Sequence, residues 1–341
     1  MQFHLRRLTR HAPPFAIAIV AATLLLGCSA DDSASAPPVE PASPETSTRE
    51  SADASAISYT AESADDGIED GFPVTVRNVE IAARPERIVS LSPTVTEMLF
   101  AIGSGDAVVA ADEYSNHPED APTTDLSGFQ PNVEAIAAFE PDLVVASDNR
   151  ENLGESLEAI GIPLLLVSSA TDIDDAYRQI EQLGVATGNI AGAAAVVAEM
   201  QSQIDAIIAN IDLPDEPLTY YHELTPDYYT VSSDTFIGAV YEMVGLTSIA
   251  DAVGESGGEY PQLSPEHIIE SDPDIILLAD TQCCGVTVEA VGQRPGWDTI
   301  TAVQNGAIVE LDEDIASRWG PRIVELLRDV ADVIRQLEPV A

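Results

Sequence analysis

Lysine is absent from this chain of 341 residues, whose basic side chains are 14 arginines set against 58 acidic residues. The net charge of −44 argues strongly against nucleic acid as a partner, because phosphate binding needs clustered cations. Charge of this sign is typical of a solvated acidic surface suited to salty surroundings. The alternative interpretation is a cationic ligand or a cation-rich partner.

Catalytic signatures are scarce as well. The sequence contains no Cys-x-x-Cys pair, no Walker loop and no His-Glu-x-x-His motif. We therefore predict that the protein is not an enzyme. A hydrophobic content of 45% excludes a wholly disordered chain, and the length favours two domains.

The N-terminus has the pattern of an export signal. Arg6, Arg7 and Arg10 precede an apolar stretch of 12 residues at positions 15–26, which is shorter than the roughly 20 residues that span a membrane. The stretch ends in Leu-Leu-Gly-Cys, which resembles the lipobox of bacterial lipoproteins, where the cysteine receives a lipid. We predict a signal peptide at residues 1–27 and a lipid anchor at Cys28. The alternative is an ordinary signal peptide.

Residues 28–72 differ in composition from everything that follows. They are rich in Ser, Ala, Pro, Asp and Glu, with very few aromatic or branched side chains. Such a segment cannot bury enough apolar area to offset the entropy lost on ordering. We therefore predict a lipidated, disordered acidic tether that lets the folded part stand clear of a membrane.

The remaining chain alternates short apolar runs, typical of buried parallel strands, with amphipathic stretches typical of helices. We expect strands at residues 88–91, 107–111, 143–146, 164–167, 220–223, 275–279 and 307–311. We expect helices at residues 94–102, 133–139, 153–160, 173–183, 236–244, 266–270, 297–302 and 321–337. This alternation predicts an α/β fold with an N-terminal lobe at 73–188 and a C-terminal lobe at 214–341.

One segment occurs twice. Residues 133–146 and 265–278 share a pattern in which a short helix stops at an acid-Pro-Asp turn and a buried strand begins. The two lobes are therefore expected to be pseudo-equivalent. Between them, residues 190–211 place apolar side chains at helical spacing without proline, which predicts an interlobe helix at 189–213. Alternatively, this helix belongs wholly to the first lobe.

Several of these features together resemble one known family. They are residues 87–103 (RIVSLSPTVTEMLFAIG), the two acid-Pro-Asp strand starts, the bridging helix and residues 317–322 (SRWGPR). The combination is similar to the substrate-binding lipoproteins of ABC importers for iron-siderophores, haem and cobalamin (the Fe/B12 periplasmic-binding family). The resemblance covers residues 78–338, essentially the whole folded part.

The resemblance implies a class III binding protein, with two Rossmann-like lobes joined by a single long α-helix. Such a protein captures a metal chelate between its lobes and delivers it, unchanged, to a permease dimer with its ATPase subunits. It implies no intrinsic cofactor, a monomer, and attachment to the extracytoplasmic face of the membrane through Cys28.

In doubly wound lobes, ligands bind outside the carboxyl ends of the strands. The loops expected there carry flat side chains that suit a planar macrocycle or a catecholate better than a small ion. These side chains are Tyr114, Phe129, Tyr228, Tyr229, Tyr260 and Trp319. Any one of them could instead belong to the core.

Similarity to cobalamin binders in particular adds Asp314 and Arg318 at the rim of the C-terminal lobe. Phe129 and Tyr260 match positions where tryptophan often lies, whereas Ser147 replaces a further tryptophan, which departs from the cobalamin pattern. Arg318 could hold a carboxylate, amide or phosphate edge of the ligand through its planar guanidinium. Alternatively, it forms a surface ion pair with Asp312 or Asp314.

Glu134 and Glu266 occupy equivalent positions of the repeat. In the family, an acid at this position of each lobe pairs with arginine on the permease, so the resemblance implies a docking role. The milder interpretation is that each acid lies in the first turn of its helix, where the helix dipole favours it by about 0.3–1 kcal/mol.

Cys283 and Cys284 are adjacent, and in an oxidising exterior they could form a vicinal disulfide. Redox switching and soft-metal binding are rival roles. Two other classes of function stay open. A free metal-ion (zinc or manganese) binding protein could use His117, His222 and His267 with nearby acids, and a thiol oxidoreductase could use the two cysteines.

Overall fold

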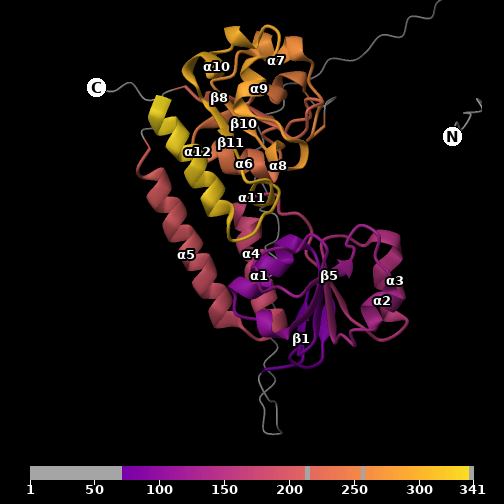
Figure 1. Ribbon diagram of the computed structural model, residues 1–341. Coiled ribbons are helices and arrows are strands. Elements are labelled where there is room, and N and C mark those ends of the chain that lie inside the picture. The colour runs from indigo at the N-terminus through magenta and orange to yellow at the C-terminus, as the bar shows by residue number, and fades with distance from the viewer. Residues whose placement is uncertain (1–70, 212–215, 255–257, 338–341) are drawn as a thin grey trace, which may run out of the picture. The chain divides into compact units, whose positions relative to one another are not determined.

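The computed structural model describes residues 71–211, 216–254 and 258–337, which belong to one compact unit. The predicted signal peptide, Cys28 and almost all of the predicted tether lie outside the described residues, as do the last two positions of the predicted interlobe helix. Figure 1 shows two α/β lobes with long helices running beside them. Within the described ranges, no helix has the length and hydropathy needed to cross a bilayer.

A five-stranded parallel sheet forms the centre of the N-terminal lobe, in the order β5-β4-β3-β6-β7. The strands are β3 (Ile88–Leu91), β4 (Val108–Asp112), β5 (Thr123–Leu126), β6 (Leu143–Ala146) and β7 (Leu164–Leu166). Every residue of β3 and β6 is buried, as continuous apolar runs require when helices cover both faces of a sheet. The strand order reverses at β3, and such a switch point opens a crevice at the carboxyl ends of the strands.

Local signals explain where the helices of this lobe begin and end. They are α1 (Pro93–Ala101), α2 (Val133–Ala137), α3 (Leu153–Glu158) and α4 (Ile173–Thr187). Pro93 suits the first turn of α1, where no backbone N–H donor is needed. The Asp172 carboxylate caps α4 by accepting from the Asp175 N–H, and Gly188 ends α4 in the left-handed conformation.

An antiparallel hairpin that the sequence did not predict precedes the first sheet. It consists of β1 (Val74–Val76) and β2 (Val79–Ile81), and it packs against α4. Phe72, which we assigned to the tether, is buried in the core of the lobe. The folded part therefore begins slightly earlier than predicted, because one aromatic side chain anchors the end of the tether.

The C-terminal lobe contains a four-stranded parallel sheet in the order β11-β10-β8-β9. Its strands are β8 (Leu218–Glu223), β9 (Leu246–Ser248), β10 (Ile275–Leu278) and β11 (Ile308–Glu310). Its helices are α6 (Phe236–Glu242), α7 (Pro265–Ser271), α8 (Thr281–Cys284), α9 (Val288–Gly292), α10 (Thr301–Asn305), α11 (Glu313–Ala316) and α12 (Ile323–Leu337). The α/β fold class predicted from the sequence is confirmed.

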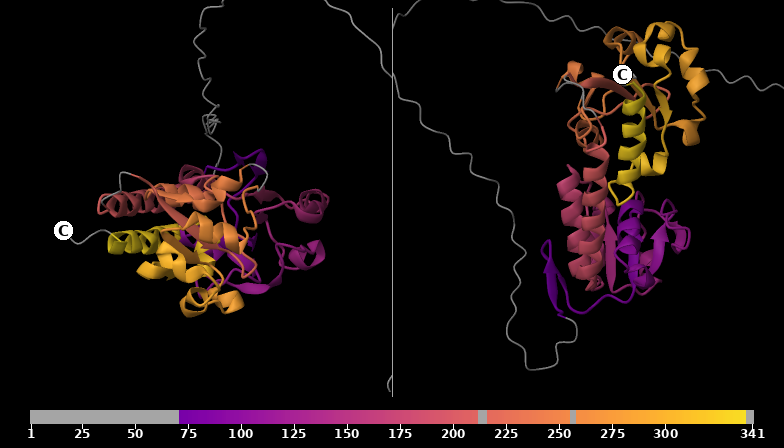
Figure 2. Two further views of the ribbon diagram at one scale, coloured as in Figure 1. Left: turned by 90° about the horizontal axis from the view of Figure 1, so that it is seen from above. Right: turned by 90° about the vertical axis from the view of Figure 1, so that its left-hand side faces the viewer.

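The long helix α5 (Ile190–Ile208) links the two lobes and ends before the predicted position 213. It packs against α4 of the N-terminal lobe and against α12 of the C-terminal lobe, and Figure 2 shows these helices side by side. Its inward face consists of Val197, Met200, Ile204 and Ile207, at the spacing that the sequence indicated. The helix therefore contacts both lobes instead of belonging wholly to the first.

The repeated acid-Pro-Asp segment has the same structural role in both lobes. The Asp142 carboxylate accepts from the backbone N–H groups of Glu86 and Arg87, just before β3, at 2.8 and 3.0 Å. The Asp274 carboxylate accepts from the Thr219 N–H in β8 at 2.8 Å. Each aspartate thus ties the start of its own strand to the start of the neighbouring central strand.

Two other expectations differ from the structure. We expected no strand at β5 or β9, because β5 is largely polar and β9 has only three residues. The predicted helix at 297–302 is wrong, since a short 3₁₀ turn, η5 (Trp297–Thr299), is separated from α10 by an extended residue, Ile300. Ile300 is fully buried, so core packing outweighs helix continuity there.

Candidate functional site

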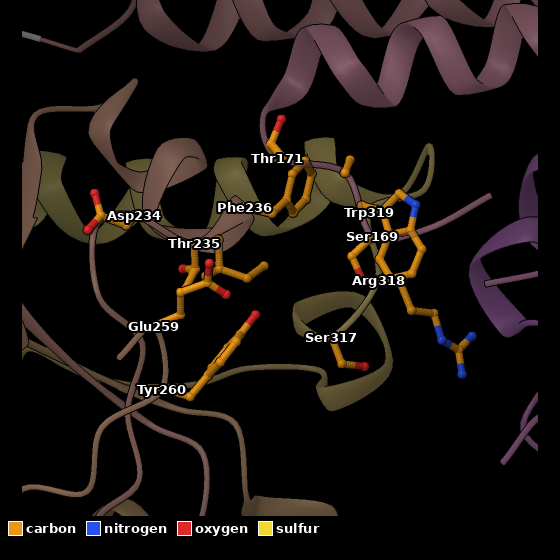
Figure 3. A pocket seen from close by; sticks show the side chains of 12 residues that line it. Ser169, Thr171, Asp234, Thr235, Phe236, Glu259, Tyr260, Ser317, Arg318 and Trp319 are labelled. Atoms are coloured by element: carbon orange, nitrogen blue, oxygen red, sulfur yellow. The ribbon is translucent and has the colours of Figure 1, made fainter. Parts of the chain in front are cut away.

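Residues from both lobes enclose a cavity of about 300 Å³. The N-terminal lobe contributes residues 169–171, which follow β7, and the C-terminal lobe contributes residues 234–237, 259–260 and 317–319. Figure 3 shows the side chains of this wall. We call this space the interlobe cavity. It lies between the lobes and beside the carboxyl end of β7.

Two of the aromatic side chains predicted from the sequence line the interlobe cavity, namely Tyr260 and Trp319. Tyr260 is 53% exposed, and the Trp319 indole N–H donates to the Gln179 side chain of α4 at 2.9 Å. Partial burial and the charge of Glu259 raise the pKa of Tyr260 above its ordinary value. Tyr260 therefore offers an aromatic face and a neutral hydroxyl to a ligand.

Tyr114 and Phe129 form a separate exposed pair on the N-terminal lobe. Their rings meet edge to face with centroids 5.8 Å apart, and the Arg150 guanidinium lies 5.4 Å from the Phe129 ring. Both rings are more than half exposed, as is unusual for large apolar side chains.

The remaining aromatic candidates lie elsewhere. Tyr228 packs against Trp297 and beneath the Arg294 guanidinium, and it belongs to the edge of the C-terminal core. Tyr229 is 43% exposed and pairs with Gln262 in an isolated bridge. Neither residue lines the interlobe cavity.

Arg318 forms the ion pair with Asp314 that one sequence interpretation offered, but within a buried cluster. Its side chain is 5% exposed, and its guanidinium donates to Glu97 at 2.6 Å, to Asp314 at 2.7 Å and to Asn116 at 2.9 Å. The pair with Asp314 exists, but the cluster is buried between the lobes and is not a surface pair. Figure 3 shows the Arg318 side chain turned away from Tyr260.

Glu97 is the site residue that sequence reasoning missed. It lies on α1, its side chain is 2% exposed, and it accepts from Arg322 at 2.5 and 3.0 Å as well as from Arg318. An acid among the apolar residues of a buried helix was the available signal, because a buried carboxylate needs a partner. The resemblance motif contained Glu97, but we assigned it no role.

A second cluster of buried charges lies at the carboxyl ends of β8 and β10. Glu223 is fully buried and accepts from both terminal nitrogens of Arg294 at 2.5 and 2.6 Å. Asp280 is also fully buried, and neither of its carboxylate oxygens has a hydrogen-bond donor among the described residues. Burial and the charge of Glu223 raise the pKa of Asp280 to about 7.

The three histidines considered for metal binding are not brought together. His117 is exposed in a loop, His222 is fully buried beside the Tyr241 hydroxyl, and His267 contacts the Ile249 carbonyl. Within the described ranges, no group of three or more His, Cys, Asp or Glu side chains is arranged to hold a metal ion. The sequence hypothesis of a free metal-ion site therefore gains no support.

A disulfide joins Cys283 and Cys284 at the exposed end of α8. The Glu313 carboxylate accepts from the backbone N–H groups of Gln282 and Cys283, which ties α8 to α11.

One further catalytic pattern exists in the sequence, a Gly-x-Ser-x-Gly at residues 254–258. Its central residues, 255–257, lie outside the described residues.

Glu134 and Glu266 are both exposed in the first turns of α2 and α7. Asn132 and Ser264 cap these helices through side-chain oxygens that accept from backbone N–H groups. The two acids therefore occupy matching places in the two lobes. Their exposure leaves both the docking and the helix-dipole interpretations open.

Two lobes around a cavity, bridged by one long helix, define a binding protein of the periplasmic type. Residues 88–315 match the model of the family described as "Periplasmic binding protein". The chain belongs to this family, and the resemblance predicted from the sequence is confirmed.

Three individual proteins illustrate the relationship. An ABC transporter substrate-binding lipoprotein of Bacillus subtilis, YvrC, is 32% identical over 279 residues, covering 77% of this chain and 86% of that protein. A cobalamin-binding protein of Halobacterium salinarum is 34% identical over 275 residues, covering 76% of this chain and 74% of that protein. The crystal structure of a possible iron-binding periplasmic protein of Staphylococcus epidermidis has a TM-score of 0.64 at 29% identity, covering 74% of this chain and 99% of that one.

Proposed function

We propose that this protein is the substrate-binding lipoprotein of an ABC importer and that its ligand is a corrinoid such as cobalamin. One observation carries the choice among metal chelates. The described lining of the interlobe cavity contains two exposed acids, Asp234 and Glu259, and one cation, Arg318, whose charge is already matched by Glu97 and Asp314. The cavity is therefore acidic.

An acidic cavity favours a corrinoid over other chelates. The rim of a corrin ring carries amide groups, whose N–H donors can pair with carboxylates such as Asp234 and Glu259, and its flat faces suit Tyr260 and Trp319. Haem carries propionates and ferric catecholates carry net negative charge, so both need cations that this cavity does not offer. The similarity to the cobalamin-binding protein of Halobacterium salinarum supports the same choice.

Titration calorimetry tests the ligand. We expect the mature protein to bind cobalamin one to one, and to bind haem and ferric catecholates more weakly. Absence of corrinoid binding, or tighter binding of haem, would overturn the proposal. The fluorescence of Trp319 provides a second signal, and a Trp319→Phe variant separates it from that of the fully buried Trp297.

Delivery of the ligand is the second part of the proposal. The mature chain is attached through Cys28 to the extracytoplasmic face of the membrane, acts as a monomer without catalysis, and docks on the permease dimer through Glu134 and Glu266. Their matching exposed places on α2 and α7 support contact with a two-fold symmetric partner.

Joint replacement of both acids tests the docking. Glu134→Gln with Glu266→Gln should abolish corrinoid uptake by cells and leave the dissociation constant of the purified protein unchanged. The matched control is Glu270→Gln, which removes one exposed acid from the other end of α7. Normal uptake by the double variant would remove the docking role.

A further inference from the structure

The buried ion cluster between the lobes carries an inference about ligand choice, which rests on the proposed function. Glu97 from the N-terminal lobe meets Arg318 and Arg322 from the C-terminal lobe, and Asp314 completes the group. Two guanidinium groups and two carboxylates give a neutral set. Its most buried members, Glu97 and Arg318, are 2% and 5% exposed.

The cluster also determines where Arg318 points. One terminal nitrogen of its guanidinium donates to Glu97, and the other donates to Asp314, to Asn116 and to the Tyr114 carbonyl at 3.0 Å. Figure 3 shows the Arg318 side chain, which makes these contacts, turned away from Tyr260. Arg318 therefore touches the interlobe cavity while its charge is directed elsewhere.

We propose that Glu97 is a specificity-determining residue that acts by positioning. Glu97 neutralises and holds Arg318 and Arg322, so that neither guanidinium is available to bind an anionic chelate in the interlobe cavity. Without the Glu97 charge, the cluster would carry one net positive charge beside the cavity. A unit charge about 10 Å from a ligand carboxylate, at an effective dielectric constant of about 20, changes affinity roughly tenfold.

The same contacts could instead serve only to hold the lobes together, and a matched pair of ligands separates the two roles. Cobinamide carries amides around its corrin ring, whereas cobyrinic acid carries carboxylates on the same ring. A purely structural role predicts that loss of Glu97 weakens both ligands in parallel. The positioning role predicts that the preference between them changes.

The experiment measures the affinity of wild type and Glu97→Gln for both ligands by calorimetry. We expect the ratio of cobyrinic acid affinity to cobinamide affinity to rise about tenfold in Glu97→Gln. The matched control, Asp332→Asn, removes one negative charge from the exposed Asp332–Arg335 pair on α12 and should leave the ratio unchanged. A parallel loss for both ligands, or an unchanged ratio, would overturn the inference.

A second variant covers the case in which Glu97→Gln does not fold. Asp314 is 38% exposed and also binds Arg318, so Asp314→Asn removes one charge with less disturbance of the core. It should move the ratio in the same direction, and an unchanged ratio would count against the inference equally. Wild-type protein that binds no corrinoid would instead refute the proposed function, so the two failures are distinguishable.

Discussion

Asp280 should make the C-terminal lobe less stable as pH rises through neutrality. In the unfolded chain its pKa returns to the ordinary value of 3.8, whereas in the folded chain burial and the neighbouring Glu223 raise its pKa to about 7. Between these two values the folded state holds a proton that the unfolded state has released. The contribution of this proton to the unfolding free energy is fully present below about pH 4, and it is lost as pH rises through about 7.

The magnitude follows from the size of the shift. A rise from 3.8 to about 7 corresponds to on the order of 4 kcal/mol of unfolding free energy over the whole window. Between pH 5 and pH 8 the expected loss is about 3 kcal/mol, because part of the window lies below pH 5. Exposed acids titrate too, so the informative quantity is the difference between wild type and Asp280→Asn, whose amide is neutral at every pH.

Urea unfolding provides the assay. The sequence has two tryptophans, so a Trp319→Phe background leaves Trp297, whose ring lies 4.6 Å from the Arg294 guanidinium of the same charge cluster. The unfolding free energy of the background protein should fall relative to that of Asp280→Asn as pH rises from 5 to 8. The reasoning would be refuted if the difference in unfolding free energy between the two proteins did not change with pH. It would also be refuted if the protein with Asp280 became the more stable one as pH rises.

Two further substitutions test the interlobe helix and the cavity wall. Gly192→Ala should destabilise the fold by about 1–3 kcal/mol in urea although alanine favours helices, because its Cβ would lie 2.1 Å from the Ile102 carbonyl oxygen. Gly292→Ala is the control, with its nearest neighbour at 3.9 Å, and equal effects would contradict the argument. Tyr260→Ala should raise the corrinoid dissociation constant by roughly 2- to 13-fold in calorimetry. The control is Ile160→Ala, because Ile160 is exposed outside the cavity and its loss should leave the dissociation constant unchanged. If Tyr260→Ala binds the corrinoid as tightly as wild type, stacking on Tyr260 is excluded.

Most of the fold could be predicted from the sequence because buried parallel strands have continuous apolar sequences. The strand at 143–146 was predicted at the bounds that the structure has. It is buried on both faces, so its sequence is apolar throughout and shows no helical spacing. The acid-Pro-Asp repeat was equally informative, since proline and a strand-capping aspartate act locally. By contrast, β5 at the sheet edge has a polar sequence, and edge strands need only one buried face.

The candidate site was harder to predict, because its decisive contacts join residues far apart in the chain. Arg318 and Trp319 were identified from the sequence, but their partners, Glu97 and Gln179, lie on helices of the other lobe. A pattern within one segment carries no information about such pairing. Sequence reasoning therefore named one acceptor of Arg318, Asp314, and missed Glu97 on the other lobe.

Besides α5, side-chain contacts join the two lobes, and these contacts change what ligand capture requires. The helix α5 packs on α4 and α12, and the loop after α11 is bound to α1 and α4 through Arg318, Arg322 and Trp319. Wide opening would separate buried guanidinium groups from Glu97, and breaking such a pair costs about 3–5 kcal/mol. A ligand can avoid this cost by entering between lobes that stay joined. We therefore expect the affinity of this protein to come from a preformed cavity more than from closure around the ligand.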